Sequence, residues 1–339
     1  MKKYTIYAIT TIGLAILAVG LFGSGSIANA AGAPGTGAAL EIAPPVLILK
    51  GNPGQTLTAQ IELRDVSLVT QVVTSQVDDF TAAGELGLPK VNIDNSTPGP
   101  YSIINWISPP AQLTLISRQI KALPLTIHIP ANASPGGYYG VVRFTATAPG
   151  VSGTGVALTP SLGALMFIRV NGNAYENLKI ASFDATVPGS TQSTRLFEQT
   201  PVNFDVRLQN TGNVFEQPTG VISINDMFGK KIADVNVNDT SGTPGFVLPH
   251  SIRKFSQTLD KGQLGNDWLF GKYTATLKLT YGSKNQSLTQ VMTFWVIPWR
   301  LILVIIAAII IVIIALIFGI RRYNDYVVNR SRNYRPRRR

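Results

Sequence analysis

Side chains able to act as an acid, a base or a nucleophile are sparse in this sequence. Its 339 residues include two histidines and no cysteine. A Cys/His nucleophile is therefore excluded, and a Ser/His/Asp triad would have to use His128 or His250. We expect His128 on the outer face of a strand and His250 in a turn beside Pro249. No Gly-x-Ser-x-Gly elbow occurs in the sequence.

The sequence gives equally little indication of a metal site or of catalysis by a pair of carboxylates. The sequence has no clustered His or Cys for zinc, and no intact calcium loop of spaced Asp or Asn with a distal Glu. Asp78, Asp79 and Asp226 are better interpreted as solvated turn residues, and no motif selects a glycosidase pair. We therefore predict a protein that is not an enzyme, with no catalytic residues, no cofactor and no metal.

Aromatic and arginine side chains are better candidates for binding. Trp106 and Trp268 lie in loop-like surroundings, where exposed indoles can anchor sugars or proteins. The alternative, which we favour, is that both cap a core. Tyr139 is a third candidate: neighbouring strand residues face opposite sides, and Tyr138 shares its parity with Val142 and Phe144. We therefore expect Tyr138 in the core and Tyr139 on the surface.

The N-terminus has the pattern of an export signal. Lys2 and Lys3 precede an apolar run over residues 6–22, and Ala28-Asn29-Ala30 supplies a small-x-small cleavage site. We expect residues 1–30 to be a signal peptide. The Gly/Ala/Pro stretch 31–39 would then be a flexible leader.

The C-terminus has the pattern of a membrane anchor. Residues 301–320 form an unbroken apolar run of 20 residues, long enough to span a bilayer core of about 30 Å. The predicted helix covers 299–320. Trp295, Trp299, Arg300, Arg321 and Arg322 are the expected membrane-interface residues.

The distribution of charge along the chain fits the predicted membrane span. The net charge is +11, and the tail 321–339 alone holds eight arginines against one aspartate. Positive residues stay in the cytoplasm, so we expect the tail inside and the large central region outside the cell membrane, with no nucleic acid as partner. An exported chain without cysteine is typical of Gram-positive-type surface proteins, which favours a bacterial source.

Apolar residues between the two ends recur with a period of two. Residues 57–63, 123–129, 202–208 and 273–281 each place alternate apolar side chains on one face, as half-buried antiparallel strands do. A hairpin is expected over 220–225 and 231–237, joined through "DMFGK". Residues 78–110 suggest long loops, with a possible strand over 101–106.

The two halves of this region share a motif. "PGGYYGVVRFTA" and "FGKYTATLKLTYG" both run glycine, short spacer, tyrosine, alternating strand. We therefore predict an all-β fold of two tandem immunoglobulin-like β-sandwich modules, residues 40–172 and 173–298, followed by one transmembrane helix.

The order of these parts resembles the WxL-interacting proteins of Gram-positive bacteria. The shared features are "GNPGQTLTAQIEL" and "IPANASPGGYYGVVRF" in the first module, "LQNTGNVF" and "FGKYTATLKLTYG" in the second, one span and a basic tail. The resemblance implies a first domain that contacts peptidoglycan and a second that binds a partner protein. It implies a membrane-anchored scaffold that retains surface proteins at the cell wall.

Two other functions remain open at this stage. An exported chaperone would expose an edge strand and a basic anchor for a partner's carboxylate, for which Arg143 or Arg207 could serve. A carbohydrate-active protein would place two carboxylates in a cleft, about 5–10 Å apart.

Overall fold

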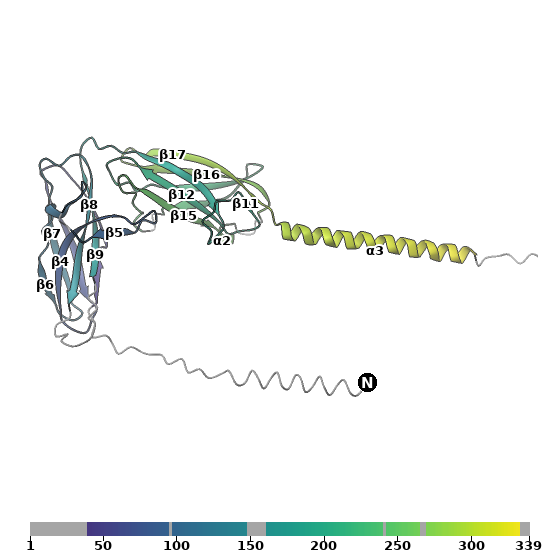
Figure 1. Ribbon diagram of the computed structural model, residues 1–339, viewed down its shortest axis with the longest axis horizontal. Coiled ribbons are helices and arrows are strands. Elements are labelled where there is room, and N and C mark those ends of the chain that lie inside the picture. The colour runs from purple at the N-terminus through teal and green to yellow at the C-terminus, as the bar shows by residue number, and fades with distance from the viewer. Residues whose placement is uncertain (1–38, 95–96, 148–160, 240–241, 265–268, 333–339) are drawn as a thin grey trace, which may run out of the picture.

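The computed structural model describes residues 39–94, 97–147, 161–239, 242–264 and 269–332. Two β-sandwich modules and one long helix make up this part of the chain (Figure 1). Each module is immunoglobulin-like, with two sheets packed around an apolar core. The predicted all-β fold with a C-terminal helix is confirmed.

The first module runs from Leu40 to Val170. Its elements are β1 (Leu40–Ala43), β2 (Val46–Gly51), β3 (Thr56–Asp65), β4 (Gln71–Ala82), β5 (Pro89–Asn92), the 3₁₀ helix η1 (Ile104–Trp106), β6 (Gln112–Leu115), β7 (Ile120–His128), β8 (Gly136–Thr147) and β9 (Ser161–Val170). One sheet has the order β1-β3-β7. The other has the order β2-β9-β8-β4-β5, and β6 pairs with β4.

Period-two alternation sets the core of this module. β7 buries Leu123, Leu125 and Ile127 and leaves His128 exposed, as predicted. In the facing sheet, β8 contributes Val142 and Phe144, both fully buried. A side chain of this size stabilises the folded state by about 1.5–3 kcal/mol when it leaves water.

The second module runs from Leu178 to Val296. Its elements are β10 (Leu178–Thr186), β11 (Leu196–Phe197), β12 (Val202–Asn210), β13 (Thr219–Asp226), β14 (Lys231–Val237), β15 (Ile252–Leu259), the short helix α2 (Lys261–Leu264), β16 (Gly271–Tyr281) and β17 (Gln286–Val296). The sheet orders are β10-β12-β15 and β11-β17-β16-β13-β14.

The alternation predicted in this half is confirmed residue by residue. β12 buries Val202, Phe204, Val206 and Leu208, and β16 buries every second residue from Tyr273 to Tyr281. β13 and β14 form the predicted hairpin through the turn after Asp226.

Residues 78–110 differ from the prediction. β4 continues to Ala82 and pairs with β5, so a hairpin replaces the first expected loop. The strand expected over 101–106 is wrong, because η1 forms there instead. Ile103 and Trp106, three residues apart, fall on one side of a 3₁₀ turn and are both buried.

The C-terminal helix α3 (Trp299–Arg332) is longer than the predicted 299–320. Within the described residues it is the one helix long and apolar enough to cross a membrane, over Trp299–Asn324, and none of its apolar window is buried against the modules. It continues past Ile320 because no proline or glycine interrupts residues 320–332.

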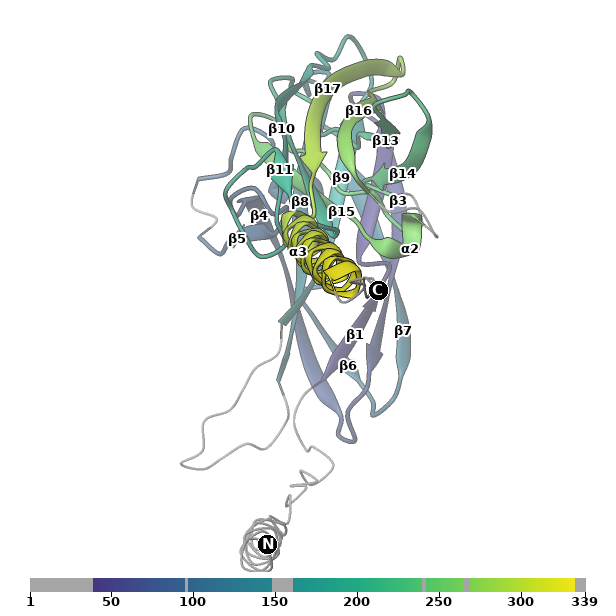
Figure 2. The same cartoon turned by 90° about the vertical axis from the view of Figure 1, so that its right-hand side faces the viewer.

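The two modules form an L-shaped body (Figure 1). The first module meets one end of the second, and α3 leaves from the opposite end. Figure 2, with α3 toward the viewer, shows strands of the first module, such as β1, β6 and β7, reaching below the second module. The corner of the L brings together segments that are distant in the sequence.

Candidate functional site

The junction between the modules begins at the "PGGYYG" stretch. The Gly137 N–H donates to the Asn213 carbonyl at 2.9 Å, and the Asn213 amide donates to the Pro135 carbonyl at 3.0 Å. A Cβ on Gly137 would lie 2.8 Å from Phe215 Cδ1 and 2.9 Å from the Phe215 backbone nitrogen. Glycine is therefore required where the loop after β12 approaches β8, so the stretches "PGGYYG" and "LQNTGNVF" meet here.

An apolar cluster fills the junction. Its buried members come from both modules: Phe80, Tyr139, Val141 and Phe167 from the first, and Phe215, Phe246 and Leu248 from the second. Phe167 and Phe246 stack across the junction with ring centroids 3.8 Å apart. The outer face of the first module's larger sheet is thus an internal surface.

Tyr139 belongs to this cluster, and the prediction that it is displayed is wrong. The two tyrosines do face opposite sides: Tyr138 is half-buried against Trp106, at 4.4 Å between centroids, while Tyr139 is 8% exposed. Tyr139 stacks on Tyr101, and burial, with smaller effects of Tyr101 and Asp79, raises its pKa to about 12. Alternation along β8 alone predicts that the side of the strand carrying Tyr139 faces solvent, but the second module covers that side.

The β4–β5 hairpin makes a second connection. Its tip carries Glu85, which forms a two-pronged ion pair with Arg207 on β12, with Arg207 Nε 2.7 Å from Glu85 Oε2. The Glu85 carbonyl accepts the Lys254 N–H at 2.7 Å. Arg207 therefore lies at the junction, but Glu85 satisfies its charge. Arg143 lies within the first module and pairs with the buried Asp78 at 2.6 Å.

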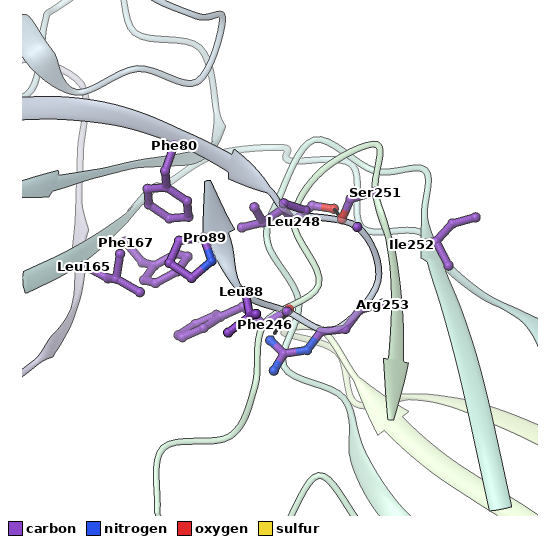
Figure 3. Close-up of a pocket in the computed structure, with 13 residues that line it drawn as sticks. Phe80, Leu88, Pro89, Leu165, Phe167, Phe246, Leu248, Ser251, Ile252 and Arg253 are labelled. Carbon is purple, nitrogen blue, oxygen red and sulfur yellow. Dashed lines mark hydrogen bonds between the residues drawn. The ribbon is translucent and has the colours of Figure 1, made fainter. Parts of the chain in front are cut away.

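A pocket lies between this hairpin and the second module (Figure 3). A water-sized sphere can reach about 50 Å³ of it, within an empty volume of about 420 Å³ that includes open solvent. Figure 3 shows Phe80, Phe167 and Phe246 on one side, Leu88 and Pro89 of the hairpin along the edge, and Arg253 at one end. Its walls are apolar except near Ser251 and Arg253, so it suits a small apolar group with an anionic group beside it.

Arg253 is the charged group of this pocket. It donates from Nη1 to the Phe246 carbonyl at 2.7 Å, its guanidinium lies 5.0 Å from the centre of the Phe255 ring, and its buried Nε has no partner. Among the described residues no acidic side chain pairs with it. Burial lowers its pKa from the ordinary value. A partly buried guanidinium without an acidic partner can form a strong charge-assisted hydrogen bond with a carboxylate.

Two carboxylates, Glu176 and Glu216, lie close together at the same corner. Although burial opposes it, hydrogen bonds from Arg169 and Ser283 lower the pKa of Glu176. Burial, and then the neighbouring Glu176, raise the pKa of Glu216 to about 7. Both side chains are buried and neither lines the pocket, so this pair lacks the open cleft that glycoside hydrolysis needs.

The other predicted site residues lie elsewhere. Trp106 is 7% exposed and packs in the core of the first module, so it offers no exposed ring to a partner. Trp268 falls outside the described residues. Trp295 and Trp299 are exposed at the far end of the second module, beside Arg300, and Arg321 and Arg322 lie along α3.

The histidines show no catalytic arrangement. His128 Nδ1 lies 2.9 Å from Thr56 Oγ1 on an exposed strand face, and His250 lies near Tyr101 at the junction, with ring centroids 6.2 Å apart. Across the described residues no group of three or more His, Cys, Asp or Glu side chains is placed to hold a metal ion.

The pocket residues were missed by the sequence interpretation, although one signal for them exists. In β8 and β9 the stretches "GGYYGVV" and "ALMFI" are apolar without alternation, which is typical of strands buried on both faces. This pattern indicates that something covers the outer face. It does not identify the loops of the second module as the cover.

Comparisons with known proteins yield structural likenesses alone. No family model matches the chain, and no curated protein matches it. A chain of the chaperone–tip adhesin complex of CFA/I fimbriae aligns with a TM-score of 0.39 and 15% identity, over 75% of this chain and 98% of that one. The class 5 fimbriae chaperone CfaA aligns with a TM-score of 0.39 and 16% identity, over 75% and 98%. The Salmonella enterica SafA pilin–SafB chaperone complex gives 0.35 and 12%, over 75% and 96%.

These solved structures are described as chaperones or their complexes, and none of the three as an enzyme. With TM-scores below 0.5 and identities of 16% or less, the likenesses assign no function to this chain. Its function has to be argued from the junction and from α3.

Proposed function

We propose that this chain is a membrane-anchored extracellular protein, not an enzyme, that binds another protein at the pocket between its modules. The observation that carries the proposal is Arg253: a guanidinium without an acidic partner among the described residues, at one end of an apolar inter-module pocket. The role of the two sandwiches is then to hold this pocket open at a fixed distance from the bilayer.

The anchor is α3. Its apolar window is uncovered by the modules, and such a surface is stable only in lipid or against another apolar surface. Eight arginines follow residue 320, so the positive-inside rule places the tail in the cytoplasm and the modules outside. The lipid bilayer is therefore the expected environment of residues 299–324.

The partner is a protein segment with an apolar side chain and a nearby carboxylate. Phe80, Phe167 and Phe246 supply the apolar walls, and Arg253 supplies a charged donor in a site of low polarity, where a charge-assisted hydrogen bond is strong. This matches the scaffold role that the WxL-interacting resemblance implies, in which surface proteins, and with them peptidoglycan, are tethered to the membrane.

A chaperone-like function is the second candidate, and Arg253 is the observation that favours it. A basic anchor in the cleft between two modules could bind the terminal carboxylate of a client, with Arg253 in the place considered for Arg143 or Arg207. A chaperone releases its client after folding, whereas a scaffold retains it. Pulse-chase of the captured protein separates the two.

Photocrosslinking tests the proposal. With the photoreactive residue p-benzoylphenylalanine in place of Leu88, which lines the pocket and is exposed, the full chain in its own cells should form a discrete adduct with another protein. Ile120, equally exposed on β7, is the control position. Arg253→Met should abolish the adduct, and Arg253→Lys, which keeps the charge, should retain part of it.

Equal adducts at Leu88 and Ile120 would contradict the proposal, as would an adduct that survives Arg253→Met in a protein of unchanged stability. Mass spectrometry of the adduct identifies the partner. Partner peptides that lack a carboxylate would exclude the assigned role of Arg253.

A further inference from the structure

At the end of the second module from which α3 leaves, several neighbouring elements carry large exposed apolar side chains. We call these six exposed residues the apolar rim: Leu196, Met227, Phe228, Phe270, Trp295 and Trp299. Phe228 is 88% exposed and Phe270 61% exposed. Single exposed apolar residues are ordinary, but a group at one end of a module marks an interaction surface.

The strand register places the rim residues at similar positions along their strands, near the end of the sheet from which α3 leaves. Leu196 on β11 pairs with Trp295 on β17, and Gly271 pairs with Val296, so Phe270 lies one residue farther toward α3. In the next strand Asp226 pairs with Tyr273, and the turn that follows Asp226 extends beyond that level. With strands about 4.8 Å apart, the rim spans roughly 14 Å from β11 to β13.

The turn after β13 is built to display its apolar residues. The Asp226 carboxylate accepts the Phe228 N–H at 2.9 Å and the Lys230 N–H at 2.8 Å, and the Asp226 N–H donates to the Lys230 carbonyl at 2.9 Å. Gly229 adopts a φ of 84°, which favours glycine. These bonds fix the turn with Phe228 exposed, while the end of the Met227 side chain lies against Gly271 and half of the residue stays exposed.

We propose that the apolar rim inserts into the outer leaflet of the bilayer, at the boundary between headgroups and acyl chains. This inference rests on the proposed anchoring by α3, whose first residue, Trp299, belongs to the rim. The occupant follows from continuity with that span and from charge: Lys272 and Arg300 are exposed beside the rim, and cations there favour anionic headgroups. Arg300 Nε also lies 3.3 Å from the Glu198 carboxylate, so Lys272 contributes more of this attraction. The second module then lies on the membrane instead of standing away from it.

The absence of cysteine makes a direct test simple. Three single-cysteine variants of the full chain carry the dye NBD: Met227→Cys on the rim, Lys284→Cys on the β16–β17 turn at the opposite end of the module, and Ile310→Cys within α3. Each is reconstituted in phosphatidylcholine–phosphatidylglycerol vesicles with a spin label either near the headgroup or deep in the acyl chain.

The inference predicts that the Met227 probe loses most of its emission to the shallow spin label and less to the deep one. The Ile310 probe should show the reverse, and the Lys284 probe should keep its emission. Adding Phe228→Asp and Phe270→Asp, both at exposed positions, should restore the emission at residue 227 without affecting residue 310.

The outcomes separate the two proposals. Quenching at Ile310 without quenching at Met227 overturns the rim and leaves the span intact, whereas no quenching at either position overturns the anchoring. Quenching at Met227 that persists in the Asp variant also overturns the rim, because closeness to the span alone would then explain it. If two NBD dyes quenched each other, and adding unlabelled chain removed that quenching, the rim would bind a second copy of the chain. This result would contradict insertion into the bilayer.

Discussion

The two adjacent tyrosines of β8 have different surroundings, and their substitutions should differ accordingly. Tyr139→Ala should lower the free energy of unfolding by about 3–5 kcal/mol, because the ring is 8% exposed and contacts Phe80 and Tyr101 in the junction. Tyr138→Ala, at a half-buried position, should cost less. Denaturant unfolding of the detergent-solubilised chain measures both.

The matched control is Tyr175→Ala, whose side chain is 60% exposed and which should change stability by no more than about 0.5 kcal/mol. A Tyr139→Ala variant as stable as this control would show that the junction does not bury the ring in solution.

Glu216 should make the stability of the chain depend on pH. Its pKa rises from an ordinary 4.5 to about 7 on folding, because of burial and of Glu176. Between these values the folded state binds more protons than the unfolded state, so stability should fall as pH rises from 4.5 to 7 and level off above. Glu216→Gln removes the proton exchange and should flatten this part of the curve.

The measurement is the melting temperature at half-unit steps from pH 4.5 to 8, a range set by the pKa of Glu216. The pKa of Glu176 is lowered, so its own contribution is lost below pH 4.5 and does not interfere. A slope that is unchanged in Glu216→Gln would assign the pH dependence to another group.

At the scale of elements, the sequence predicted which residues are buried in strands that pack on one face. It did not do so for strands that are covered on both faces. β7, β12 and β16 follow the alternation of their sequences because solvent covers one face of each. The β4–β5 hairpin was taken for loops because Gly84, Gly87 and Pro89 break its pattern. Gly87 has a φ of 76°, which favours glycine, and a Cβ there would also lie 2.2 Å from the Arg253 guanidinium carbon, a contact that no local pattern reports.

The hairpin tip should depend on its ion pair with β12. Glu85→Lys should weaken the docking of the hairpin, because it places two cations side by side, and it should speed hydrogen exchange of the Lys254 N–H that the Glu85 carbonyl accepts. Combining Glu85→Lys with Arg207→Glu reverses the pair and should restore protection. The pair is more than a third exposed, so its stabilisation is at most about 1 kcal/mol.

Exchange at the Asn203 amide within β12 serves as the internal control, since the hairpin does not cover it. If the exchange rate of the Lys254 N–H did not change with the charge of residue 85, apolar contacts alone would hold the hairpin.

At the scale of the whole molecule, the candidate site exists only because three segments meet: β9, the β4–β5 hairpin and the loop that leads into β15. The sequence predicts two modules and an anchor, but the pocket depends on how the modules pack on each other. The residues of the pocket come from both modules, so the sequence pattern of one module alone cannot predict the pocket.

The central claim is therefore that the two modules behave as one rigid body. Spin labels at Ile120→Cys in the first module and Lys284→Cys in the second, both exposed, report the distance between them in the full chain by pulsed electron resonance. The account predicts one narrow distance distribution, as narrow as that of an Ile48→Cys and Ile120→Cys pair within the first module. Gly137→Val should broaden it, because the added side chain meets Phe215, while Gly242→Ala, whose methyl meets nothing within 4 Å, should not. A broad distribution in the unaltered junction, equal to that of Gly137→Val, would contradict the account.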